Sequence, residues 1–254
     1  MRRAAAILLL AAGTARAQTM LDQEERLIEL HSLLVAIPAV QAPGALRPGE
    51  ASLGLEIVGI PAIDGTTGGR RQITASDRTR VFPRPRLALG LPLAGDLRAF
   101  AGVAYIPPIE IRGVSSHLAA AEAGAAWVRG PLAAGLRLSA VYATSRSPVT
   151  DPGTRDTLRT IVAGADASLG YRLDLAPGSV TPYAGLGVHR VDGRFRVTSD
   201  GQVLTSRTTD LGLAAGARLL ARRRVEAVLE LVAYPGRLVH PNVRVAWTPE
   251  LRAR

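Results

Sequence analysis

The stretch IVAGADASLGYRL, residues 161–173, decides the fold because its apolar residues recur at every second position. Every odd-numbered residue in it is Ile, Ala, Leu or Tyr, whereas the even-numbered ones include Gly164, Asp166 and Arg172. A period of two is the period of a β-strand, whose successive side chains point to opposite faces. About ten residues of a tilted strand are enough to cross a bilayer. The stretch therefore predicts a strand that crosses a membrane and has one apolar face.

Nine further segments of similar length show the same alternation. They are residues 51–60, 83–93, 97–106, 117–128, 132–143, 180–191, 203–220, 224–233 and 239–247. An even number of alternating segments, apolar outside and polar inside, is typical of an outer-membrane barrel. We therefore predict an all-β fold: an antiparallel up-and-down transmembrane β-barrel of about ten strands over residues 51–247.

The connections between the predicted strands alternate in length. The short ones are 94–96, 129–131, 174–178 and 221–223, and the longer or more polar ones are 61–82, 107–116, 144–157 and 192–202. Only the last connection, 235–238, is short where a long one is expected. Periplasmic turns are short and extracellular loops are long in bacterial outer-membrane barrels. The alternation therefore predicts that both termini lie in the periplasm.

Aromatic residues near the strand ends agree with this topology. The aromatic interface belt that we predict consists of Tyr105, Trp127, Tyr142, Tyr171 and Trp247. Tyr183 and Tyr234 also lie near strand ends. Tyr and Trp are enriched where one edge of the ring meets water and the other meets lipid. Their positions favour strands that end at two membrane interfaces.

A soluble periplasmic barrel of the lipocalin kind, or a β-sandwich, is the alternative fold. Such proteins bury the apolar face and expose the polar one, which gives the same alternation. The two interpretations differ in how many charged residues the apolar face carries. Across the ten segments it carries almost none. We therefore predict a membrane barrel and an outer-membrane location.

The first 17 residues are predicted to be a signal peptide. Arg2 and Arg3 precede an apolar core over residues 4–12, and Ala15-Arg16-Ala17 gives a cleavage site of the small-x-small kind. This segment is too short to cross a bilayer as a helix. It implies export from the cytoplasm.

Residues 18–50 are predicted to form a short periplasmic helix and a linker. Residues 22–37 carry apolar side chains at helical spacing, and Pro38 ends the pattern. Prolines and glycines over 43–49 indicate an irregular linker. The helix could instead enter the barrel lumen or dock on a neighbour, but we expect it outside the barrel. Residues 248–254 form a C-terminal tail.

The composition narrows the chemistry. The formal charge is +10, yet all the basic residues are arginine and none is lysine, and they are spread along the chain. This spread argues against nucleic-acid binding, which needs a basic patch. The chain has no cysteine, which removes disulfides, thiolate catalysis and cysteine-based metal sites. No cofactor is expected.

Many charged residues fall on the predicted inner face. The lumen-lining set is Glu56, Arg84, Arg86, Arg98, Glu122, Arg137, Asp166, Arg172, Asp210, Arg218, Arg224, Glu226, Glu230 and Arg244. Side chains alone can fill a barrel little wider than eight strands, and buried charges need partners. We therefore favour arginine–carboxylate ladders that close the lumen. The alternative is a narrow ion-lined pore with a weak preference for anions, which small lumen residues such as Gly164 and Gly187 would allow.

Catalysis has little support in the sequence. His117, His189 and His240 fall near the predicted outer rim, and Asp64, Asp151 and Asp156 lie in or near the outer connections. A hydrolase at the rim is conceivable with these residue types. They are, however, ordinary polar rim residues, and no spacing of the His-Glu-x-x-His kind points to a metal. We predict no catalytic residues, no metal site and no enzyme activity.

The dyad repeat, the unequal connections, the aromatic strand ends and the signal peptide together resemble the small bacterial outer-membrane β-barrel proteins, loosely the OmpA/OmpW-like class. The resemblance covers residues 51–247 and is one of architecture. It implies outer-membrane lipids and the outer-membrane assembly machinery as partners. That machinery reads a last strand with an aromatic end, which residues 243–247, Val-Arg-Val-Ala-Trp, resemble, although a tail follows.

The expected role is a narrow porin-like channel, which a small solute or ion could cross, or a structural surface barrel. Surface binding or hydrolysis by loops 61–82 and 192–202 is the alternative for a membrane barrel.

Overall fold

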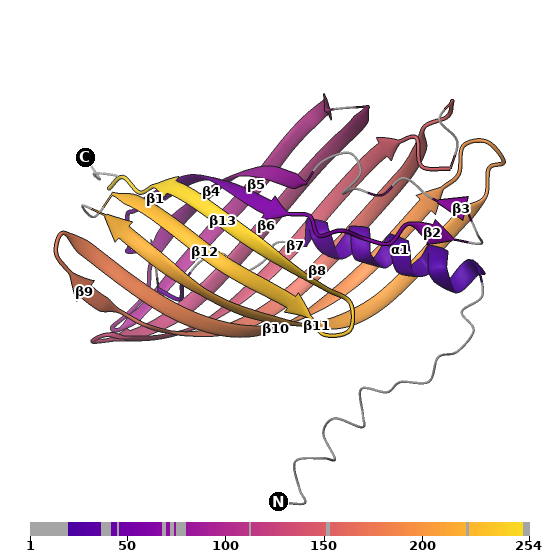
Figure 1. Ribbon diagram of the computed structural model, residues 1–254. Helices are drawn as coiled ribbons and strands as arrows, with labels where there is room; N and C mark the ends of the chain where they lie inside the picture. The colour runs from indigo at the N-terminus through magenta and orange to yellow at the C-terminus, as the bar shows by residue number, and fades with distance from the viewer. Residues whose placement is uncertain are drawn as a thin grey trace, which may run out of the picture.

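The computed structural model describes residues 20–36, 42–44, 46–67, 70–71, 74, 80–111, 113–150, 153–221 and 224–250. Within them the chain forms a closed antiparallel barrel of ten strands and one helix, α1 (Met20–Val35) (Figure 1). The barrel strands are β1 (Ala51–Gly59), β4 (Val81–Pro92), β5 (Leu97–Ile111), β6 (Val114–Arg129), β7 (Leu132–Ser147), β8 (Asp156–Tyr171), β10 (Gly178–Arg196), β11 (Val203–Ala221), β12 (Val225–Tyr234) and β13 (Leu238–Trp247). Three short strands are β2 (Thr66–Thr67), β3 (Arg70–Arg71) and β9 (Leu173–Leu175). The predicted signal peptide lies outside the described residues, as do residues 251–254 of the tail.

Each barrel strand pairs with the next one along the chain. The last strand, β13, pairs with the first, β1, so that Leu53 lies opposite Trp247 and the sheet has no free edge. This closure satisfies the strand hydrogen bonds internally, as a hydrocarbon environment requires. The predicted up-and-down barrel is confirmed, and its strands lie where the alternating segments are.

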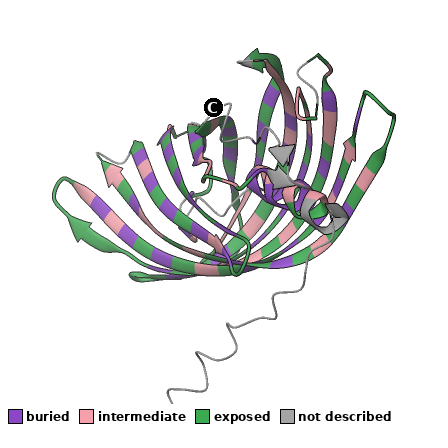
Figure 2. Ribbon diagram, turned by 45° about the vertical axis from the view of Figure 1, so that its right-hand side comes forward, coloured by how far each residue is buried: buried purple, intermediate pink, exposed green. Residues whose placement is uncertain are grey.

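The two faces of the wall differ as the alternation predicts. Figure 2 shows buried and exposed residues succeeding one another along the strands. Leu136, Leu138 and Leu169 are among the most exposed side chains, at 69%, 66% and 59%. Such a surface of exposed leucine and valine would be unstable in water. It matches the apolar outer band of a membrane barrel.

Two of the predicted short turns, 94–96 and 129–131, lie at one end of the barrel, whereas in the region of a third, 174–178, β9 pairs with the start of β10. Gly95 and Gly130 have φ of 65° and 58°, a left-handed conformation that glycine adopts at little cost. We call this the short-turn end. The opposite end carries the connections 60–80, 148–155 and 197–202 and the last turn, 235–237, and we call it the long-connection end.

One predicted loop is mostly strand. In the region 107–116, β5 continues to Ile111 and β6 begins at Val114. Pro107 and Pro108 have no backbone N–H to donate, and the pairing shifts across them as a β-bulge. The strand therefore tolerates the two prolines, and the wall extends beyond the predicted strand ends here.

Helix α1 lies inside the barrel, not outside it as we expected. Leu30, Leu33 and Leu34 are buried against inward-facing residues of the wall, such as Val162 and Val191. The amphipathic pattern predicted the helix correctly, but an apolar stripe does not say what covers it. The wall at this level is apolar on its inner face, so the stripe is buried in the lumen.

Between α1 and β1, the described residues 42–44 and 46–50 lie inside the barrel toward the short-turn end. Pro43 lies against Gly135 and Gly170, and the Arg47 carbonyl lies against Gly90. The backbone of Glu50 then pairs with that of Glu250 in an isolated antiparallel β-bridge. Pro43 and Arg47 thus lie against the inner face of the barrel wall. No helix in the part of the chain that the structure describes is long and apolar enough to span a membrane.

Candidate functional site

A continuous row of ion pairs follows the inner wall of the barrel at mid-height. Glu56 on β1 binds Arg84 on β4 at 2.5 Å and lies 3.5 Å from Arg86. Arg86 also pairs with Glu122 on β6 through two hydrogen bonds. Positive and negative groups alternate along this row, so each charge has an opposite neighbour.

The row continues onto the next three strands. Glu122 lies 3.1 Å from Arg137 on β7, which binds Asp166 on β8 at 2.6 Å. His189 on β10 follows, with its Nε2 3.4 Å from Asp166. We call Arg84, Glu56, Arg86, Glu122, Arg137, Asp166 and His189 the ladder. Its three arginines balance its three carboxylates.

Glycines make room for the ladder. Arg86 lies opposite Gly54 in the sheet register, Glu122 opposite Gly102, and Arg137 opposite Gly124. Gly187 and Gly164 stand opposite Asp166 and His189 in the same way. A Cβ on Gly187 would lie 2.2 Å from the Asp166 carboxylate, and one on Gly164 would lie 2.5 Å from the His189 ring. The lumen glycines therefore hold packed side chains instead of lining an open passage.

A second cluster occupies the other side of the lumen. Glu226 on β12 binds Arg218 at 2.6 Å and also pairs with Arg244 on β13. Tyr183 donates a hydrogen bond of 2.8 Å to Glu230. Tyr183 and Tyr234 are buried inside the lumen, 5% and 1% exposed, and so do not belong to an interface belt.

Four residues of the predicted lumen set lie apart from these clusters. Arg172 and Arg224 are exposed at the short-turn end, where Arg172 pairs with Asp174 at 2.6 Å. Arg98 is half-buried and donates to the Gly44 carbonyl at 3.0 Å. Asp210 lies near α1. The structure places all the others in the ladder or the second cluster.

The charged groups in the middle of the lumen are almost inaccessible to water. The Arg84, Glu56 and Glu226 side chains are 0% exposed, and those of Arg86 and Arg244 are 2% exposed. Residues that line a water-filled channel would be exposed to it. The lumen is therefore filled at this level.

Apolar residues that surround α1 fill the long-connection half of the lumen. Sequence reasoning missed this part of the interior. The inward-facing residues that pack with the helix are Ala104, Ile106, Leu118, Ala120, Val141, Ala143, Val162, Val191, Val232, Tyr234 and Leu238. Several lie in stretches that are apolar on both faces, such as 118–121 and 141–143. That double-sided pattern was the available signal, because a wall that is apolar inside needs an apolar partner in the lumen.

Polar contacts fix the orientation of the helix. Arg84 donates to the carbonyls of Val35 and Ala36 at 3.2 and 3.3 Å, at the helix C-terminal end that favours a positive charge. The hydroxyls of Ser32 and Thr160 are 3.0 Å apart. Arg84 therefore binds both Glu56 of the ladder and the C-terminal end of α1.

An ion pair connects α1 to the long-connection end. Arg237, in the turn after β12, lies 2.6 Å from Glu29 and 3.6 Å from Asp210. Burial raises the pKa of Glu29, and this effect outweighs the lowering by Arg237. Protonation of Glu29 therefore favours the docked helix.

Cavities among the described residues flank the filled region. One of 530 Å³ lies at the short-turn end and is lined by both signs of charge, including Arg98, Arg172 and Glu250. One of 650 Å³ lies beside α1 near Glu29 and Arg237. Two of 120 Å³ each, one lined by Leu27 and the other by Leu34, follow the helix. All lie around the helix or at the barrel mouth.

The five predicted belt residues are all on the outer face. Tyr105, Trp127, Tyr142, Tyr171 and Trp247 are 37% to 52% exposed. Tyr171 and Trp247 end their strands as expected, whereas β5 and β7 continue beyond Tyr105 and Tyr142. At the long-connection end, the barrel wall therefore extends beyond the level of Tyr105 and Tyr142.

The histidines and acids considered for rim catalysis do not form one site. His117 stands on the outer face between Tyr105 and Tyr142, whereas His189 and His240 are buried inside. Asp156 is 1% exposed and accepts hydrogen bonds from the backbone N–H groups of Thr150 and Thr198. Asp151 lies outside the described residues. Asp156 thus has a structural role in holding two connections together.

No protein-family model matches the chain, and no curated protein matches its sequence. Among solved structures, the translocator domain of autotransporter NalP from Neisseria meningitidis is 11% identical, with 89% of this chain and 94% of that one covered and a TM-score of 0.42. The beta domain of the Bordetella autotransporter Brka is 15% identical, with 79% and 98% covered and a TM-score of 0.40.

Ail, the attachment invasion locus protein of Yersinia pestis, is 11% identical, with 80% and 99% covered and a TM-score of 0.32. The architecture that the resemblance implies, a closed antiparallel barrel of ten strands, is confirmed by the structure itself. At these identities the likeness concerns the fold alone.

Proposed function

We propose that this protein is a closed structural barrel of the outer membrane, with its lumen filled by its own helix and by the ladder. The observation that carries the proposal is the burial of the mid-lumen charges, with Arg84 and Glu56 0% exposed. A narrow porin-like channel would require a water-filled path past these groups.

The proposal includes an orientation. The short-turn end faces the periplasm and the long-connection end faces outward, as in outer-membrane barrels in general. The exposed leucine and valine of the wall then contact lipid, and insertion by the outer-membrane assembly machinery follows from the aromatic end of β13 at Trp247. Export would use the predicted signal peptide.

The proposal assigns no enzyme activity to the barrel. Its support is that the two inward histidines have lumen neighbours: His189 is next to Asp166, and His240 lies 3.2 Å from the Asn242 side chain. Both side chains are packed among aromatic and charged groups instead of facing a cavity that could hold a substrate.

Ion conductance tests the proposal. The intact chain, inserted in a planar bilayer, is expected to give no steady current. The charge-reversal variants Arg137→Glu and Arg218→Glu are expected to lose stability without gaining a selective current, because each removes an arginine partner and places a new carboxylate beside buried carboxylates. A steady current from the intact chain, with a selectivity that these substitutions change, would show a pore instead.

A variant with α1 locked in place tests the role of the helix in the same conductance experiment. Ser32→Cys with Thr160→Cys would lock α1 to β8 through a disulfide, because the two hydroxyls are 3.0 Å apart. The locked and reduced forms are expected to be equally silent. A current that appears only after reduction would show that the helix is a gate and that the barrel conducts when it moves.

A further inference from the structure

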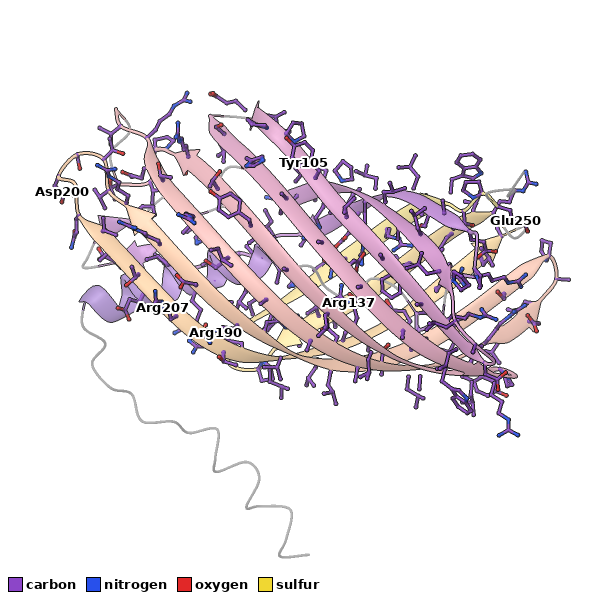
Figure 3. All side chains as sticks on the ribbon, turned by 180° about the vertical axis from the view of Figure 1, so that it is seen from behind. Tyr105, Arg137, Arg190, Asp200, Arg207 and Glu250 are labelled. Carbon is purple, nitrogen blue, oxygen red and sulfur yellow. The ribbon has the colours of Figure 1, made fainter. Side chains whose placement is uncertain are left out.

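A cluster of arginines lies on the outer face of the wall, toward the long-connection end. Its members are exposed residues of β7, β8, β10 and β11, which we call the arginine patch: Arg146, Arg159, Arg190, Arg194, Arg196 and Arg207. Figure 3 labels Arg190 and Arg207 on the part of the wall formed by β10 and β11, and Asp200 at the tip beyond them. The patch is outside the barrel and takes no part in the ladder.

The sheet register brings these charges close together. Arg159 and Arg194 are direct partners across β8 and β10. Arg146 and Arg196 both stand opposite Thr157, one on each side. Directly opposed like charges destabilise a sheet unless something compensates them. A bound anion would compensate the repulsion between these arginines.

The chain itself supplies little compensation. Asp192 lies on the same face and binds Arg207 at 2.9 Å. Glu110 is near the patch through the register of β5 with β6 and β6 with β7, but it binds Arg155 through two bonds of 2.9 Å. Within the part of the chain that the structure describes, none of Arg146, Arg190, Arg194 and Arg196 has an ion pair.

The position of the patch identifies the kind of anion. Val188 and Leu211, exposed and apolar, lie next below Arg190 on the outer face of β10 and β11. Arg159 stands 5.3 Å above the ring of Tyr142, which belongs to the aromatic belt. The arginines are thus at the height where the apolar band ends. Lipid headgroups, not free solutes, occupy that level.

We propose that the arginine patch binds the phosphate groups of the anionic glycolipid of the outer leaflet, of the lipopolysaccharide class. Arginine forks bind phosphate oxygens in a bidentate manner, and Arg194 and Arg196, two residues apart on the outer face of β10, can bind neighbouring phosphates. Arg159 and Arg194 would share one phosphate, which removes their repulsion. The patch holds the barrel at a defined depth among these lipids, independently of whether the lumen conducts.

Binding of purified lipopolysaccharide to the intact chain in neutral detergent tests the proposal. The double variant Arg159→Gln/Arg194→Gln is expected to bind about 100-fold more weakly, about tenfold for each charge-assisted contact. The matched control is Arg129→Gln/Arg224→Gln, two exposed arginines near the short-turn end, which should keep the affinity. Lipopolysaccharide from which the phosphates have been removed should bind the intact chain as weakly as intact lipopolysaccharide binds the double variant.

Three results would overturn the proposal: unchanged affinity in the double variant, equal binding of the dephosphorylated lipid, or competition by inorganic phosphate at the same phosphate concentration. The last would indicate a site for a free anion. Mobility in SDS with and without boiling shows whether each variant has folded. If the double variant does not fold, the affinity of the intact chain for lipopolysaccharide is measured at increasing salt concentration instead. This affinity must fall as the charges are screened. A constant affinity would refute binding by the arginine patch.

Discussion

Removal of Arg137 is the perturbation that most clearly separates a closed barrel from a pore. Arg137 binds Asp166 at 2.6 Å and Glu122 at 3.1 Å, and its side chain is 6% exposed. In Arg137→Gln, Glu122 keeps both bonds from Arg86, but Asp166 keeps only His189 at 3.4 Å. One buried carboxylate therefore loses its main partner.

The expected loss is about 3–5 kcal/mol in the free energy of unfolding, the usual effect of removing one member of a buried ion pair. For a domain of this size it corresponds to a fall of roughly 6–20 °C in the midpoint of thermal unfolding. Replacing both partners, as in Arg137→Met/Asp166→Asn, leaves no uncompensated charge. This double variant is expected to recover most of the loss.

The assay is unfolding in detergent or vesicles, followed by the mobility shift between unheated and boiled samples. Arg155→Gln is the matched control, because it breaks an ion pair of similar geometry whose members are 53% and 48% exposed; no measurable change is expected. The reasoning is refuted if Arg137→Gln is as stable as the control, or if the double variant loses as much as the single one.

Further predictions concern the helix and the outer face. Gly193→Val should displace α1, because a Cβ at this position would lie 2.7 Å from Ile28 Cγ2 and 2.9 Å from Ser32 Oγ. We expect the free energy of unfolding to fall by about 1–3 kcal/mol and hydrogen exchange in α1 to become faster. The control Thr209→Val, on the outer face, should change neither quantity. Because the pKa of Glu29 is raised in the folded protein, docking is favoured by protonation and weakens as the pH rises through that pKa. Glu29→Gln should therefore protect α1 from exchange more than the native residue does, by a margin that grows with pH; a margin that shrinks with rising pH would contradict this. Ser32→Cys/Thr160→Cys should form a disulfide on oxidation, detected by non-reducing gel mobility, and failure of the folded protein to cross-link would place the helix elsewhere.

The strands could be predicted because their signal is local. Alternation over 161–173 and its nine counterparts needs only the period of the side chains, so strand order and closure followed. The extra strand at 107–116 has a local cause as well: Pro107 and Pro108 indicate a turn, but a β-bulge lets the strand continue across them.

The contents of the lumen could be predicted only in part. Inward-facing arginines and carboxylates were evident, but which of them pair depends on the strand register, which the structure shows, as for Glu56 opposite Arg84. The helix could not be placed, because its apolar stripe fits any apolar surface. The outer arginines near Arg194 were also missed, since the predicted strand ended at residue 191 and residues 192–202 were predicted to be a protruding ribbon outside the barrel wall.

Thiol accessibility in the middle of the lumen tests the central claim, a barrel closed by its own side chains. The chain has no cysteine, so Ser139→Cys introduces a single thiol at a site that is 9% exposed, and Ser52→Cys does so at one that is 3% exposed. Ser199→Cys, in the exposed 197–202 connection, is the accessible control. We predict that a small charged thiol reagent labels the control at once and the two lumen positions only after unfolding. Rapid labelling of Ser139→Cys and Ser52→Cys in the folded protein would mean that water fills the lumen and would contradict the account.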